Sequence, residues 1–130
     1  MNAPEAGGRS LRKAAGNAAV GGDTGEVSPP KFRMSDGVSV VVPCFNEGPV
    51  LERSAERLRD TLAALGRRWE LIFVDDGSED GTRDRLPDLA RRLGGTRVVL
   101  QPANGGRGAA VRRGVEHATQ PLAGFLDIDL

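Results

Sequence analysis

The stretch ELIFVDDGSEDGT, residues 70–82, runs from an apolar half into a polar, glycine-rich half. The first half, ELIFVD at 70–75, is short and apolar through its centre, as expected for a strand buried on both faces. The second half supplies the Asp, Ser and Gly that a tight turn into a helix requires. We therefore predict a buried strand over 70–75, followed through this turn by a helix over about 81–93.

Strands and helices alternate on both sides of this stretch. The other predicted elements are strands over 38–42, 96–101 and 122–128, and helices over 49–66 and around Val111, Val115 and Ala118. Pro87 lies inside the 81–93 helix and predicts that this helix starts late or bends. The alternation predicts an α/β fold, a parallel sheet with helices on both faces. Right-handed crossovers favour the strand order 3-2-1-4.

In such a sheet, ligands bind beyond the carboxyl ends of the strands, where the strand order reverses. The four predicted strands are followed by PCFNEG (43–48), DDGSEDGT (75–82), PANGGRG (102–108) and DID (127–129). These turns contain most of the unusual polar and glycine-rich sequence of the chain. The topology therefore predicts one ligand site, built from four turns on one edge of the sheet.

The adjacent acids Asp75 and Asp76 are the least ordinary feature of the second turn. A plain turn with a helix cap explains Gly77, Ser78 and Asp80. It does not explain two carboxylates at the end of a buried strand, where desolvation and mutual repulsion are costly unless ligands or donors offset them. The pair therefore favours a binding site over a simple connection.

Each of the other turns also suits a particular ligand group. In NGGRG, small residues let backbone N–H groups approach an oxyanion at a helix N-terminus, and Arg107 adds a forked cation. Asp127 and Asp129 would lie on the same face of a regular strand and could bind one divalent cation. Phe45 can pack on a base, and Glu47 can accept from base or ribose donors. The GxGxxG fingerprint of dinucleotide enzymes is absent after the first strand.

Taken together, VSVVVPCFNE, FVDDGSEDGT, NGGRGAAVRRG and FLDIDL resemble the N-terminal half of family-2 glycosyltransferases, which have the Rossmann-like GT-A fold. The resemblance covers residues 38–130 and is greatest to the polyprenyl-phosphate (dolichyl-phosphate) glycosyltransferases. It implies that the base and ribose pocket is lined by Pro43, Phe45 and Glu47, and that the nucleoside site is completed by Val74 and Asp76.

The resemblance also assigns the last turn. Asp127 and Asp129 would be the catalytic DxD pair that holds Mg²⁺ or Mn²⁺ and the sugar diphosphate, with Asp127 sharing its oxygens between the ion and the ribose. Ile128, between them, and Arg107 complete the implied nucleotide-sugar site. The family often has Lys at the position of Arg107, so the positive charge is kept.

The implied activity is metal-dependent, inverting transfer of a sugar from a nucleoside diphosphate sugar to an acceptor, with polyprenyl phosphate expected. UDP-glucose and GDP-mannose users share these motifs, and NGGRGAAVRRG favours UDP-glucose. The family continues beyond DxD with an acceptor-binding part, so we expect a chain truncated after DxD. A non-catalytic nucleotide-sugar-binding fragment is the alternative. A nucleotidyltransferase or dinucleotide-binding domain fits the predicted fold but not the turn sequences.

Composition limits the other possibilities. Lys plus Arg equals Asp plus Glu, 18 against 18, so no net charge draws the chain to nucleic acid. Residues 1–35 are rich in Gly, Ala, Pro and charge, which predicts a disordered N-terminal arm ahead of the 36–130 domain. The lone Cys44, the absence of a secretory signal and the absence of a membrane-length apolar run favour a cytoplasmic protein, with a peripheral place at the inner face of the membrane as an option. Neither Cys44 nor His117 has neighbours in sequence that favour catalysis.

Overall fold

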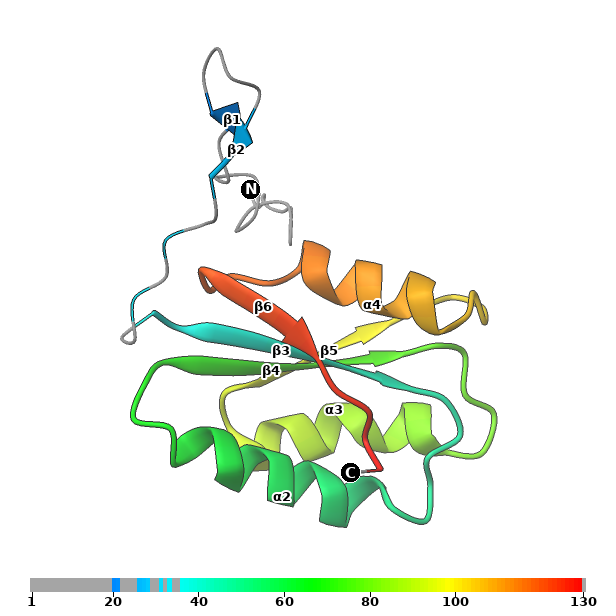
Figure 1. The fold of residues 1–130 in the computed structure, drawn as a ribbon. Helices are drawn as coiled ribbons and strands as arrows, with labels where there is room; N and C mark the ends of the chain where they lie inside the picture. The colour runs from blue at the N-terminus through cyan, green and yellow to red at the C-terminus, as the bar shows by residue number, and fades with distance from the viewer. Residues whose placement is uncertain (1–19, 22–25, 29–30, 32, 34–35, 130) are drawn as a thin grey trace.

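The computed structural model describes residues 20–21, 26–28, 31, 33 and 36–129 (Figure 1). Most of the predicted N-terminal arm, 1–35, lies outside the described residues. Within that range the structure has two short strands, β1 (Val20–Gly21) and β2 (Glu26–Val27), which pair antiparallel. The remainder forms an α/β domain that carries all the predicted site residues.

A four-stranded sheet forms the centre of the domain. Its strands are β3 (Val38–Cys44), β4 (Trp69–Asp75), β5 (Thr96–Leu100) and β6 (Leu122–Phe125). All neighbouring pairs are parallel, and the spatial order is β5-β4-β3-β6. This confirms the predicted order 3-2-1-4, in which the direction of winding reverses between β3 and β6.

Three helices cover the two faces of this sheet, as predicted. Figure 1 shows α2 (Leu51–Ala63) and α3 (Thr82–Leu93) on one face and α4 (Arg107–Glu116) on the other. The α3 helix begins at Thr82 and continues through Pro87 to Leu93, so the predicted late start is wrong. Both strand β4 and helix α3 therefore adjoin the turn at 76–81 that the sequence singled out.

Each face of the sheet has its own apolar core. On the α2 and α3 face, Phe73 packs among leucines such as Leu51 and Leu86, all of them fully buried. On the α4 face, Val41 and Ile72 pack against Ala110 and its neighbours. A methyl group at Gly114 would lie 2.3 Å from Val41 Cγ1, so glycine lets α4 approach the sheet closely. This close packing fixes the position of α4, whose first residue is Arg107.

The last strand is shorter than predicted. We expected a strand over 122–128, but β6 ends at Phe125 and the chain then leaves the sheet toward α2 (Figure 1). After the backbone bond from Leu126 N to Val41 O (3.0 Å), Ile128 enters the α2–α3 core and is 2 % exposed. The expectation that strand alternation places Asp127 and Asp129 on one face is therefore wrong, because neither residue lies in a strand.

Among the described residues, no helix is both long enough and apolar enough to span a membrane.

Candidate functional site

The carboxyl ends of the strands surround a cavity of about 500 Å³. Its lining comes from all four turns that the sequence predicted to converge. The lining residues are Pro43, Cys44, Phe45, Glu47, Asp76, Asn104, Gly106, Arg107, Asp127, Ile128 and Asp129. Segments 86 positions apart, from Pro43 to Asp129, thus meet at one edge of the sheet. The predicted site residues are brought together with one exception.

The exception is Val74. Its side chain is fully buried on the α4 face of the sheet, where it packs with Val41 and Ile72, and it does not line the cavity. The next residue, Asp75, is also fully buried, but Asp76 reaches the cavity. Only the second acid of the pair therefore faces a ligand-sized space.

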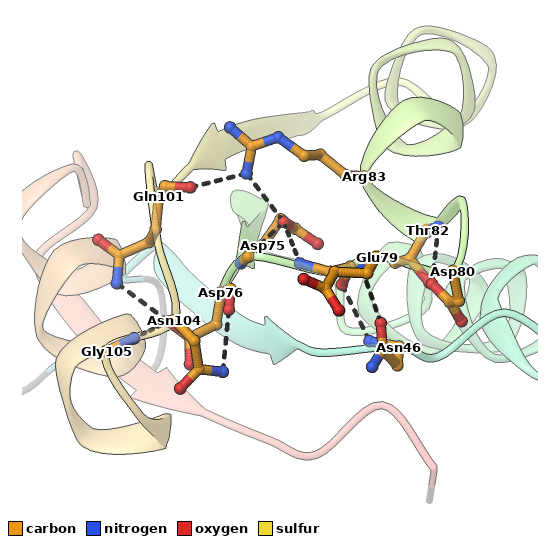
Figure 2. A network of polar contacts seen from close by, with 12 residues as sticks. Asn46, Asp75, Asp76, Glu79, Asp80, Thr82, Arg83, Gln101, Asn104 and Gly105 are labelled. Atoms are coloured by element: carbon orange, nitrogen blue, oxygen red, sulfur yellow. Dashed lines mark hydrogen bonds and ion pairs between the residues drawn. The ribbon is translucent and has the colours of Figure 1, made fainter.

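Asp75 organises the turn that follows β4. Its Oδ2 accepts hydrogen bonds from the N–H groups of Gly77 and Ser78, each at 3.0 Å, and from Arg83 Nη1 at 3.1 Å (Figure 2). Arg83 Nη1 also donates to Gln101 O at 2.7 Å, which ties this turn to the end of β5. Among the described residues, Asp75 Oδ1 has no hydrogen-bond partner. These donors offset the cost of one buried carboxylate without any ligand.

Asp76 is 3 % exposed and holds the glycine-rich loop. Its Oδ1 accepts from Gly105 N at 2.8 Å and its Oδ2 from Gly106 N at 2.9 Å. Asn104 Nδ2 in turn donates to Asp76 O at 3.1 Å (Figure 2). The sequence suggested that amides of this loop would hold a phosphate, but these two amides bind a carboxylate of the chain itself. Two of the loop amides are therefore engaged within the chain, and Arg107 remains as a predicted phosphate contact.

The turn after β4 can contact the loop after β5 closely because it has a glycine, Gly77, at the point of contact. A methyl group at Gly77 would lie 2.7 Å from Asn104 N, and Gly77 has a φ of +84°, a conformation that favours glycine. The turn after β4 and the loop after β5 thus pack backbone to backbone.

Arg107 extends from the first turn of α4 to the acids after β6. Its Nη2 lies 2.6 Å from Asp127 Oδ1, and its guanidinium stands 5.3 Å from the centre of the Phe125 ring. Both side chains of the ion pair are more than half exposed, at 58 % for Arg107 and 55 % for Asp127. The predicted phosphate-binding cation and the predicted metal-binding acid therefore lie in direct contact.

Glu47 shares the cavity with the two terminal acids. Burial raises the pKa of the Glu47 carboxyl, and the negative charges of Asp129, Asp80 and Asp127 raise it further, against a hydrogen bond from Phe45 N that lowers it. A cation bound among these acids would offset their repulsion. Oxygen is the ligand type that Mg²⁺ and Mn²⁺ prefer, so the residue types fit. Across the described part of the chain, however, no three His, Cys, Asp or Glu side chains converge as a complete cation site.

The two residues set aside in the sequence, Cys44 and His117, differ in their position relative to the cavity. Cys44 is buried in the cavity lining, and burial raises the pKa of its thiol well above the usual range, which keeps it protonated. His117 caps the end of α4 and is not part of the cavity lining. Two residues that the sequence did not single out, Asn46 and Asn104, take part in the polar network of the site (Figure 2).

Comparison with known proteins agrees with this arrangement. Residues 39–130, most of the chain, match the family described as glycosyl transferase family 2. The chain belongs to that family. The match includes β3 from its second residue, all of β4 to β6, and every residue of the cavity lining.

Curated relatives include an undecaprenyl-phosphate 4-deoxy-4-formamido-L-arabinose transferase of Klebsiella pneumoniae, 38% identical over 94 residues, which cover 72% of this chain. Another is the dolichyl-phosphate beta-glucosyltransferase ALG5C of Trichomonas vaginalis, 37% identical over 97 residues, covering 68% of this chain. The matched part is 29% and 28% of those relatives, so this chain spans less than a third of their length.

Two solved structures with a similar fold contain a bound nucleotide or nucleotide sugar. A Pyrobaculum calidifontis mannosyltransferase in complex with GDP-Man and Mn²⁺ is 26% identical with a TM-score of 0.59, over 71% of this chain and 27% of that one. Mycobacterium tuberculosis glucosyl-3-phosphoglycerate synthase, with Mn²⁺, UDP and glucosyl-3-phosphoglycerate, is 26% identical with a TM-score of 0.54, over 76% and 38%. Both are glycosyltransferases that share the sheet and helix arrangement described above.

Proposed function

We propose that the protein to which this chain contributes transfers a sugar from a nucleoside diphosphate sugar to a polyprenyl phosphate, and that the cavity described here binds the donor. The observation that carries the proposal is the convergence of four separate turns on one cavity, with an exposed aromatic ring, spare carboxylate oxygens and an arginine around it. The names of the two curated relatives support the lipid-phosphate acceptor. With such an acceptor, the protein would work at a membrane surface.

The nucleoside would occupy the part of the cavity between the turns after β3 and β4. The Phe45 ring is 44 % exposed and can stack on a base. Glu47 can accept from base or ribose donors, and Pro43 adds apolar surface beside them. Asp76 Oδ2 accepts one hydrogen bond from the chain and has a second lone pair for a nucleoside N–H or O–H. Val74 would contribute through its main chain, since its side chain is buried elsewhere.

The diphosphate would lie at the other end, beside Arg107 and the acids after β6. Arg107 presents a forked cation to phosphate oxygens, and the buried Ile128 side chain anchors the flanking acids. Asp127 and Asp129 would hold Mg²⁺ or Mn²⁺ together with diphosphate oxygens, since the two carboxylates do not form a complete site by themselves. When bound, the cation neutralises the charge that develops on the departing nucleoside diphosphate. The Mn²⁺ in both solved complexes supports this choice of ion.

The sugar would be transferred with inversion. The acceptor phosphate is already ionised near neutral pH and can attack the anomeric carbon from the side opposite the leaving diphosphate. The phosphate oxygen forms the new bond as the bond to the diphosphate oxygen breaks, and no proton has to be removed. The cavity would therefore need to bind and orient the donor, and does not need a dedicated base.

A donor-binding fragment without transfer is the second candidate. The observation in its favour is length, because this chain spans 29% of the Klebsiella relative. The two candidates share the donor site and differ only in the acceptor.

Calorimetric titration of the chain with UDP-glucose and with GDP-mannose, each with and without Mn²⁺, tests the donor site. We expect binding that Mn²⁺ strengthens, with UDP-glucose preferred. A second assay would follow radiolabelled sugar from the preferred donor into polyprenyl phosphate in detergent. Donor binding without transfer would favour the fragment, and failure to bind either donor would refute the proposal.

A further inference from the structure

We propose that Asn46 is a positioning residue for the donor nucleoside: it fixes the turn that presents Phe45 and Glu47 to the cavity, without contacting the ligand itself. The inference rests on the proposed function. Asn46 lies between two residues of the cavity lining but is absent from that lining. We therefore expect it to act on a ligand through its neighbours.

The backbone conformation of Asn46 is unusual. Its φ is +54°, and it is the one non-glycine residue with a positive φ in the part of the chain that the structure describes. This left-handed conformation is unfavourable for most side chains, whereas Asn adopts it several times more readily. It turns the chain sharply between Phe45 and Glu47, which places both residues at the cavity.

Two hydrogen bonds hold this conformation. The Asn46 N–H donates to Ser78 Oγ at 2.9 Å, and Asn46 Oδ1 accepts from Glu79 N, also at 2.9 Å (Figure 2). Ser78 is itself held by the buried Asp75, since Ser78 N donates to Asp75 Oδ2. The turn after β3 is thereby joined to a fully buried carboxylate.

The residues after Asn46 continue the same contact. Glu47 N donates to Thr82 Oγ1 at 3.0 Å, and Gly48 N donates to Asp80 Oδ2 at 3.1 Å. Three successive residues of one turn are thus bound to the other turn. Of the three, Asn46 alone contacts the segment after β4 through both its main chain and its side chain. Replacing the Asn46 side chain should therefore disturb the turn most.

Phe45 depends on this support because it has little of its own. Its ring is 44 % exposed, and the hydrogen bond from its N–H to Glu47 Oε2 is long, at 3.4 Å. The Glu47 carboxylate also faces the negative charges of Asp80, Asp127 and Asp129, which disfavour its present position. Without Asn46 the turn can relax, and the two nucleoside contacts would be lost while the acids after β6 remain in place.

The test compares ligands that use different parts of the cavity. Asn46→Ala removes the side-chain acceptor and disfavours the left-handed backbone, whereas Asn46→Gly removes only the acceptor. Each variant is titrated with UDP or GDP, whichever the unmodified chain binds, and separately with inorganic diphosphate plus Mn²⁺. We expect the nucleotide Kd to rise about 10-fold for Ala and about 3-fold for Gly, with diphosphate affinity unchanged.

Ser39→Ala is the matched control. Ser39 Oγ also makes buried hydrogen bonds, but at the opposite end of the sheet. This variant should lose stability with both affinities unchanged. Hydrogen exchange of the Glu79 amide in the unliganded chain gives a readout independent of ligands, and it should accelerate in both Asn46 variants.

The outcomes separate the two ideas. If the unmodified chain binds neither UDP nor GDP, the proposed function fails and this inference with it. If it binds nucleotide and Asn46→Ala binds equally well, only the positioning role is refuted. An equal loss of nucleotide and diphosphate affinity, or unchanged exchange at Glu79, would also refute it, because a local role for Asn46 predicts neither.

Discussion

Buried acids lie at both ends of strand β4, and two of them, Glu70 and Asp76, differ in how fully the chain satisfies their hydrogen-bonding capacity. At the amino end, Glu70 Oε2 accepts from Ser39 Oγ, Thr119 N and Thr119 Oγ1 at 2.6 to 2.9 Å, and its Oε1 lies 3.2 Å from Arg97 Nη2. At the carboxyl end, Asp76 Oδ2 has a single donor from the chain and borders the cavity. Glu70 is saturated by the protein, whereas Asp76 has hydrogen-bonding capacity left.

This contrast distinguishes a candidate binding acid from an acid whose partners are all within the chain. Burial does not separate them, since Glu70 is 9 % exposed and Asp76 is 3 % exposed. Spare lone pairs and an adjoining cavity do separate them. Substitutions at the amino end of β4 should therefore lower stability, whereas substitutions at its carboxyl end should lower ligand affinity.

The largest effect is expected at Asp129. Asn in its place keeps the size but removes the charge that would hold the cation, so Mn²⁺-supported nucleotide binding should fall by ~100-fold or more. Electron paramagnetic resonance of bound Mn²⁺ and calorimetry measure this loss. Asp88→Asn is the control, because Asp88 is an exposed acid on α3 outside the cavity. Unchanged Mn²⁺ affinity in Asp129→Asn would contradict the assignment of this residue.

Glu70→Ala should give the opposite pattern. Ser39, Thr119 and Arg97 would lose a shared buried acceptor, which lowers the free energy of unfolding by about 2–3 kcal/mol. Urea titration measures the stability change. Nucleotide affinity, measured where the variant is still folded, should stay unchanged. A loss of nucleotide affinity in Glu70→Ala would contradict the assignment of a purely structural role to this end of β4.

Asp76→Ala should weaken nucleotide binding by about 10-fold even in chelator, because its role is hydrogen bonding and support of the glycine-rich loop. Asp129→Asn provides the comparison, since in chelator its affinity should match that of the unmodified chain. Calorimetry in the presence of EDTA makes both measurements. Equal affinities for Asp76→Ala and the unmodified chain would remove Asp76 from the nucleoside site.

The smallest effect concerns Arg107. Its guanidinium forms an ion pair with the Asp127 carboxylate and would compete with a cation for it. Arg107→Gln should therefore strengthen Mn²⁺ binding by about 3-fold in the absence of nucleotide. The change is small because both partners are more than half exposed. Arg112→Gln, on the same helix, removes the same charge away from the cavity and serves as control. With nucleoside diphosphate present the sign should reverse, since a phosphate ligand is then lost.

The sequence predicted the sheet order and the shared edge because both follow from local signals, apolar strands and the polar turns after them. It did not predict where β6 ends, since that depends on Ile128 entering a core formed by residues far away in the chain. It also missed that Asp76 binds Gly105 and Gly106, which are 29 and 30 positions away in the sequence. That contact depends on how the turn after β4 and the loop after β5 are placed relative to each other, which local sequence patterns do not give. The burial of Val74 agrees with the apolar strand pattern, whereas its place in the nucleoside site was implied only by the family resemblance.

Ile128 gives the acids after β6 a property that their charges alone would not. Its side chain is 2 % exposed, while Asp127 and Asp129 on either side are exposed. An apolar anchor between two acids sets their backbone separation during folding. The conformational entropy of bringing the pair together is therefore lost on folding, which would lower the entropic cost of binding the proposed cation. A DxD turn of this kind is preorganised by the hydrophobic effect.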